Sequence, residues 1–172
     1  MTMRTLAALL LALPLAAPAQ TATPAWQRNA VPFYDTVHAL QGIYGHWALP
    51  RAQDFDRSAR ALAPAVAALC EAPAAGGKAA LESARTAWQA TTRAWEQLAA
   101  VSVGPVISRR SQRAIDFTPT RPALIDKAIA AQPQGAKAFE RIGTPAKGLP
   151  ALEWLLWTRP VQPGSSACSY AH

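Results

Sequence analysis

The sequence is poor in the residues that carry catalytic and metal chemistry. Of 172 residues, only two are cysteine and three are histidine, and the histidines form neither a His-x-x-x-His pair nor a His-Glu-x-x-His motif. The usual zinc-protease helix is therefore absent. There is also no Gly-x-Ser-x-Gly motif and no Gly-x-x-x-x-Gly-Lys loop. These absences exclude the usual nucleophile elbow and the usual phosphate-binding loop.

Signals for strands and for membrane spans are missing as well. No run alternates apolar and polar residues for long enough to form a strand, and the Asn-Gly and Asp-Gly hairpin dipeptides do not occur. No segment has 18 consecutive apolar residues, so we expect no transmembrane anchor. The sequence predicts an all-α fold.

Acidic residues are fewer than basic ones, 10 against 17, which gives a formal net charge of +7. The basic residues are scattered singly, except for Arg109-Arg110 with Arg113. Two interpretations are open: general solubility, and an anionic partner such as a membrane surface or nucleic acid. The scatter favours the first, and we expect no nucleic-acid partner.

The N-terminus has the order of a secretory signal. A short basic region (Met1 to Arg4) precedes an apolar stretch (Leu6 to Ala16) and a small-x-small site at Ala17-Pro18-Ala19. We predict a signal peptide over residues 1–19, cleaved after Ala19, and a helical domain over residues 20–172. The apolar stretch is too short to span a bilayer, and no cysteine follows the cleavage site to carry a lipid. The expected location is the periplasm or cell envelope.

The two cysteines, Cys70 and Cys168, both lie in the mature part. They allow one intrachain pairing, and disulfides persist in exported proteins. We predict a bridge between them over two free buried thiols. A bridge closing a loop of about 100 residues stabilises a fold by roughly 4 to 5 kcal/mol in the chain-entropy model.

Apolar periodicity predicts an up-down helical bundle. Helices are expected over residues 25–47, from an N-cap at Asp54 to about Cys70, and from about residue 78 to Leu98. Pro64 should kink or split the second helix. The third carries the apolar stripe Leu81, Ala84, Trp88, Thr91, Trp95 and Leu98, opposite a polar face with Glu82 and Arg85 at pairing distance.

The second half of the chain is less regular. After Gly104-Pro105 we expect a long irregular excursion over residues 103–121, a short helix after Pro122, and a helix that has Pro150 in its first turn. A final helix after Ser165-Ser166 would be too short to stand by itself. We therefore expect that the given sequence ends inside a helix.

Glu153 is the ionisable residue of greatest interest. Its neighbours Leu152, Trp154, Leu155, Leu156 and Trp157 predict a helix that is apolar nearly all round and buried. A buried carboxylate must be paired, metal-bound or protonated. The plainer alternative is a glutamate in the first helical turn, favoured by the helix dipole and paired with an arginine.

Several motifs resemble those of the imelysin-like family. The segment Gly148-Leu149-Pro150-Ala151-Leu152-Glu153 resembles the family's signature helix, whose best-known form is Gly-x-His-x-x-Glu. Further matches are Leu69-Cys70-x-x-Pro73, Gly104-Pro105, Ile115-Asp116-Phe117-x-Pro119-x-Arg121 and Cys168-x-Tyr170-Ala171. Gly148 and Glu153 match the signature, and the histidine position is Pro150, which offers no ligand nitrogen and no general base.

The resemblance implies a periplasmic or cell-surface protein of two helical bundles, with a pocket near the signature at their junction. This chain covers about half the usual family length, so it corresponds to the first bundle. Family members are described as peptidases or as parts of iron uptake. The cofactor is unknown, with iron or zinc as the candidates, and the expected partners are a small ligand or metal and other iron-uptake proteins of the envelope.

These observations leave three hypotheses. The first is a binding protein linked to metal or iron acquisition, with a pocket formed by Gly148, Pro150, Glu153, Asp116, Arg113 and Arg121, in which an arginine opposes Glu153. The second is a metal-dependent peptidase in which Glu153 acts in catalysis as metal ligand or general base, and His38 or His46 replaces the missing histidine as a metal ligand. The third is a structural envelope protein without a ligand.

Overall fold

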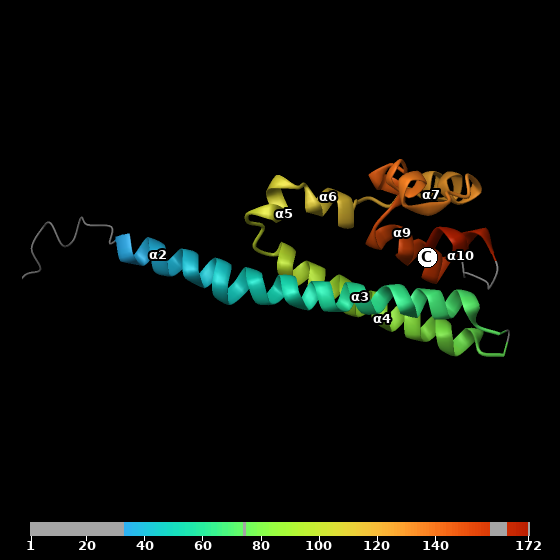
Figure 1. The fold of residues 1–172 in the computed structure, drawn as a ribbon, viewed down its shortest axis with the longest axis horizontal. Coiled ribbons are helices and arrows are strands. Elements are labelled where there is room, and N and C mark those ends of the chain that lie inside the picture. The colour runs from blue at the N-terminus through green and yellow to red at the C-terminus, as the bar shows by residue number, and fades with distance from the viewer. Residues whose placement is uncertain (1–32, 74, 159–164, 172) are drawn as a thin grey trace, which may run out of the picture. The chain divides into compact units, whose positions relative to one another are not determined.

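The computed structural model describes residues 33–73, 75–158 and 165–171 (Figure 1). The predicted signal peptide and the start of the helix expected from residue 25 lie outside these residues. The chain divides into two compact units, residues 1–37 and 38–172. The described residues contain helices and no strand, so the all-α prediction is confirmed.

The first described helices follow one another without a loop. Helix α2 (Phe33–Gln41) continues into a π-helical segment, η1 (Gly42–Ala48), and then into α3 (Leu49–Glu71). Within η1, Gly42 and Gly45 have low helix propensity, and Pro50 follows with no backbone N–H to donate. The wider π turn therefore falls where the α-helical hydrogen-bond ladder is weakest.

The predicted second helix begins earlier than expected, at Leu49, and continues through Pro64. Asp54 is not an N-cap, because α3 begins at Leu49 and Asp54 lies inside it, paired with Arg51 and Arg57. Pro64 does not split the helix. Pro64 and Arg60 are both exposed, so water can satisfy the Arg60 carbonyl that the proline leaves without a donor.

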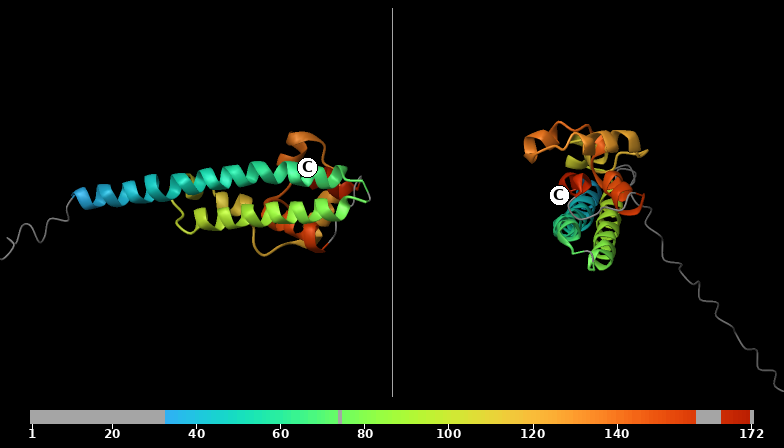
Figure 2. Two further views of the ribbon diagram at one scale, coloured as in Figure 1. Left: turned by 90° about the horizontal axis from the view of Figure 1, so that it is seen from below. Right: turned by 90° about the vertical axis from the view of Figure 1, so that its right-hand side faces the viewer.

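Helix α4 (Gly77–Ala99) packs against α3 as the second arm of a hairpin, which Figures 1 and 2 show side by side. Of its predicted apolar stripe, Ala84, Thr91, Trp95 and Leu98 are buried. The Thr91 hydroxyl donates to the backbone oxygens of Ala87 (2.9 Å) and, across the hairpin, Ser58 (3.1 Å). This stripe forms the core of the hairpin, as the periodicity predicted.

The segment expected to be an irregular excursion contains two short helices, α5 (Pro105–Ser108) and α6 (Ser111–Ile115). Proline at the start of α5 supplies helical φ where no N–H is needed, which explains one of them. The helix predicted after Pro122 is confirmed as α7 (Pro122–Ala130). Helix α8 (Gly135–Glu140) and a 3₁₀ turn, η2 (Thr144–Ala146), follow without having been predicted.

The C-terminal elements lie between the hairpin and α7 in both figures. They are α9 (Leu149–Glu153), the π-helical η3 (Trp154–Thr158) and α10 (Ser166–Ala171). Leu155, Leu156 and Tyr170 are buried with Leu69 and Ile125 in one core cluster. Helix α10 is short but packs on α3 and α7, so tertiary contacts stabilise what its length could not.

The predicted disulfide between Cys70 and Cys168 is present, with the two Cα atoms 5.5 Å apart. It joins the end of α3 to α10. None of the helices in the described part of the chain combines the length and hydropathy that a bilayer crossing requires.

Candidate ligand site beside the Gly148–Glu153 helix

Gly148 fixes the start of the signature helix. Its φ of 82° and ψ of −166° lie in a region that is essentially restricted to glycine. A Cβ at this position would also lie 2.9 Å from the carbonyl carbon of Ile115. The backbone at the end of α6 thus packs directly on the residue before α9, and a side chain of any size would separate them.

Two side chains of α4 hold the signature helix α9 and the π-helical η3 that continues it. The indole N–H of Trp88 donates to the backbone oxygen of Leu149 at 2.9 Å. At the other end, Nε and Nη2 of Arg85 donate to the Leu156 oxygen at 3.0 and 2.8 Å, and its guanidinium lies over the Trp157 ring. Carbonyls at a helix end have no intrahelical donor, so Arg85 satisfies one that would otherwise be unpaired.

The sequence predicted only one of the two polar contacts that Arg85 makes with described residues. Its ion pair with Glu82 (2.7 Å) was predicted from the spacing. Its contact with Leu156, 71 residues away, was not, because periodicity assigned Arg85 to the polar face of α4. No local signal identifies this partner.

Glu153 is exposed, which corrects the prediction of a buried carboxylate. It is the last residue of α9, not part of the first turn, and it has no ion pair or hydrogen bond with any described residue. The helix was expected to be buried on all sides, but its buried residues lie on one side: Leu149, Pro150, Ala151, Leu155 and Leu156. The Glu153 side faces outward.

A pocket of about 260 Å³ borders Glu153. Two tryptophans and two threonines line it with prolines of α7 and α9: Thr120, Pro122, Pro150, Trp154, Trp157 and Thr158. The indole N–H of Trp154 is buried and has no acceptor among the described residues. The helix changes from α to π at Trp154, directly after Glu153. Such π segments occur frequently at functional sites.

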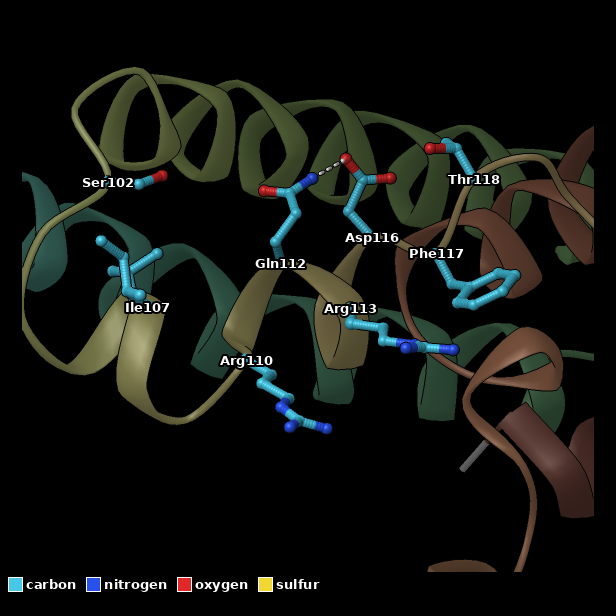
Figure 3. A pocket seen from close by; sticks show the side chains of 9 residues that line it. Ser102, Ile107, Arg110, Gln112, Arg113, Asp116, Phe117 and Thr118 are labelled. Carbon is cyan, nitrogen blue, oxygen red and sulfur yellow. Dashed lines mark hydrogen bonds between the residues drawn. The ribbon is translucent and has the colours of Figure 1, made fainter.

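Arg113 and Asp116 do not line the Glu153 pocket. They border a separate cavity of about 480 Å³ beside α5 and α6, drawn in Figure 3. There Asp116 accepts a hydrogen bond from Gln112 (3.1 Å), and the Arg113 guanidinium lies 5.8 Å from the centre of the Phe117 ring. The residues expected to form one site therefore lie at two separate pockets. Gly148, next to the Glu153 pocket, packs on the backbone of Ile115, next to the other.

The remaining candidates do not complete a metal site. Arg121 is exposed and precedes α7; its neighbours Thr120 and Pro122 line the Glu153 pocket, and it does not. His38 and His46 are exposed, on α2 and η1. Across the described ranges, no three histidine, cysteine, aspartate or glutamate side chains converge to hold a metal ion. The idea that a histidine replaces Pro150 therefore gains no support.

A comparison with known protein families identifies the family of this chain. The family model of imelysin (peptidase M75) matches residues 48–170, more than two thirds of the chain. The chain belongs to the imelysin family. No curated protein and no solved structure matches it.

The residues that match the family model include the helices that form the site. The matched range includes α3, α4, both cysteines and the whole segment from Gly148 to Glu153. In this imelysin-family chain the histidine position of the best-known signature is Pro150, which is buried at the start of α9. Proline suits that place because its fixed φ is compatible with the first turn of a helix.

Proposed function

We propose that this protein is an exported binding protein of the cell envelope, linked to metal or iron acquisition, whose ligand lies beside Glu153. The observation that carries the proposal is the exposed carboxylate of Glu153, which pairs with no described residue and lies at the border of a pocket. A carboxylate on an ordinary helix surface needs no explanation. This one adjoins a cavity, two indoles and a change of helix type.

The lining favours a hard cation or a cationic complex. Carboxylate and hydroxyl oxygens, here from Glu153, Thr120 and Thr158, are ligands that hard cations prefer. Three such groups are fewer than the six positions of an octahedral ion, so water or a small chelator would supply the others. The rings of Trp154 and Trp157 can also contact a cation through their faces.

The scaffold suits recognition because the pocket wall is fixed. Arg85 and Trp88 hold both ends of the helix that carries Glu153, and the Trp88 and Trp157 rings pack edge to face at 5.0 Å. A wall that is already ordered loses little conformational entropy when a ligand binds.

Export is supported by two independent features. The leader over residues 1–19 has the pattern of a signal peptide, and the Cys70–Cys168 disulfide fits an oxidising compartment. Fractionation of cells that express the full chain tests this part: the protein should be found in the periplasm without residues 1–19. Cytoplasmic protein that retains its leader would contradict it.

A metal-dependent peptidase has less support. Pro150 replaces the histidine, and none of the described residues that line the Glu153 pocket is a histidine. Metal analysis of the full-length protein purified from the periplasm, beside Glu153→Gln, tests the binding proposal. We expect iron or another metal in the parent and little in the variant, with Glu140→Gln, an exposed change on α8, behaving as the parent. Equal and negligible metal in all three would overturn the metal link.

A further inference from the structure

The cavity beside α5 and α6 has the charge and lining of an anion site. Two of its lining residues are Arg110 and Arg113, from the one basic cluster in the sequence. Neither forms an ion pair with any described residue, in contrast to Arg51, Arg57, Arg60 and Arg85. Two positive charges therefore border a cavity of about 480 Å³, and neither is ion-paired with a carboxylate of a described residue.

The one acidic group at this cavity is already engaged. Asp116 accepts the hydrogen bond from Gln112, and Figure 3 shows these two side chains pointing toward each other on one side of α6. The side chains of Arg110 and Arg113 extend away from that pair. An anion beside the guanidinium groups would thus be separated from the Asp116 carboxylate.

The backbone fixes the two arginines one helical turn apart. The Arg110 carbonyl accepts hydrogen bonds from the N–H groups of Arg113 (3.0 Å) and Ala114 (3.2 Å), so Arg110 is the N-cap of α6 and Arg113 lies in the first turn that follows. Arg110 also has a left-handed backbone (φ 53°, ψ 40°), which asparagine or glycine adopts more readily than arginine.

The rest of the lining is apolar, with a few neutral hydrogen-bonding groups. Val106, Ile107 and Phe117 supply apolar surface, and Ser102 and Thr118 supply hydroxyls. A guanidinium stacked near an aromatic ring, as Arg113 is near Phe117, keeps its N–H edge available for a carboxylate or phosphate. We propose that this cavity binds a small organic anion that carries an apolar group, separately from the Glu153 pocket.

The test uses 1-naphthyl phosphate as the probe and isothermal titration calorimetry on the full-length exported protein. Arg110→Asn removes one charge with a residue that suits the left-handed backbone, and Arg113→Gln removes the other. Each change should weaken binding about tenfold, and the double variant more, because each removes a charge-assisted hydrogen bond. Uncharged 1-naphthol and inorganic phosphate should both bind more weakly than the probe.

Arg109→Gln is the matched control, since Arg109 belongs to the same cluster and does not line the cavity. Its affinity should stay within about twofold of the parent, since an exposed charge outside the cavity is largely screened by salt. The proposal is overturned if Arg109→Gln weakens binding as much as Arg110→Asn, if 1-naphthol binds as tightly as the phosphate, or if the parent does not bind the probe. Far-UV circular dichroism of each variant verifies that it is folded.

Discussion

The Cα of Gly148 packs against the backbone carbonyl of Ile115, and no side chain fits between them. The contact joins two segments more than 30 residues apart in sequence. One leads into the helix that carries Glu153, and the other ends the helix that carries Arg113. Both candidate pockets therefore depend on this one close approach.

Replacement of Gly148 by alanine should destabilise the fold by about 3 kcal/mol or more. The glycine-only backbone and the clash with Ile115 each contribute about 1 to 3 kcal/mol. The matched control is Gly135→Ala, where φ is also positive (73°) but no atom lies within 4 Å of the added Cβ. It should cost only about 1 to 2 kcal/mol. Urea unfolding measures both, and equal losses would show that the Ile115 contact is unimportant.

Loss of the Arg85 guanidinium should weaken the attachment of the signature helix. Arg85→Met leaves the Leu156 carbonyl without its donor and should cost about 1 to 3 kcal/mol. Arg93→Met removes a charge from an exposed position of the same helix and should change stability by less than about 0.5 kcal/mol. Thermal unfolding of the two variants distinguishes a specific cap from a general effect of charge.

Removal of the disulfide should be among the most destabilising changes. The bridge spans 98 residues, and the chain-entropy model gives about 4 to 5 kcal/mol for a loop of that size. The double variant Cys70→Ser/Cys168→Ser should unfold at markedly lower urea concentration than the parent. Reduction of the parent should reproduce the loss, and a reduced protein as stable as the oxidised one would contradict the account.

Tyr170 should make stability fall at high pH. Burial raises the pKa of its phenol to about 12, from 10.0, because the phenolate is poorly solvated there. Between these values the unfolded chain loses the proton and the folded chain keeps it, so the free energy of unfolding decreases as pH rises. The hydroxyl has no partner among the described residues, so Tyr170→Phe should fold well. The variant should lose less stability than the parent between pH 10 and 12.

The sequence predicted the parts of the fold that local patterns determine. The 3-4 repeat of α4 marked its buried face, Pro122 and Pro150 marked two helix starts, and the two cysteines allowed one pairing. Asp54 was wrongly predicted as an N-cap, because packing of α3 against a long hairpin partner overrides its local signal for a helix start. Pro64 lies inside α3 without dividing it, since tertiary packing outweighs the local preference there too.

The sequence predicted which segments form the site but not how their side chains are arranged. It identified both the signature segment and the Asp116 segment, and Gly148 does bring their backbones together. The burial of Glu153 was wrong because apolar neighbours in sequence do not show which side of a short helix faces the core. The roles of Arg85 and Trp88 depend on contacts with residues more than 60 positions away, for which one sequence gives no signal.

The most direct test of the Glu153 proposal is equilibrium dialysis of the metal-free, full-length exported protein against radioactive iron(III) supplied as its nitrilotriacetate complex. The account predicts saturable binding of about one iron per chain, reduced about tenfold or more in affinity by Glu153→Gln and unchanged by Glu140→Gln, because only Glu153 borders the pocket. Identical binding by the parent and Glu153→Gln, or no binding by either, would contradict it.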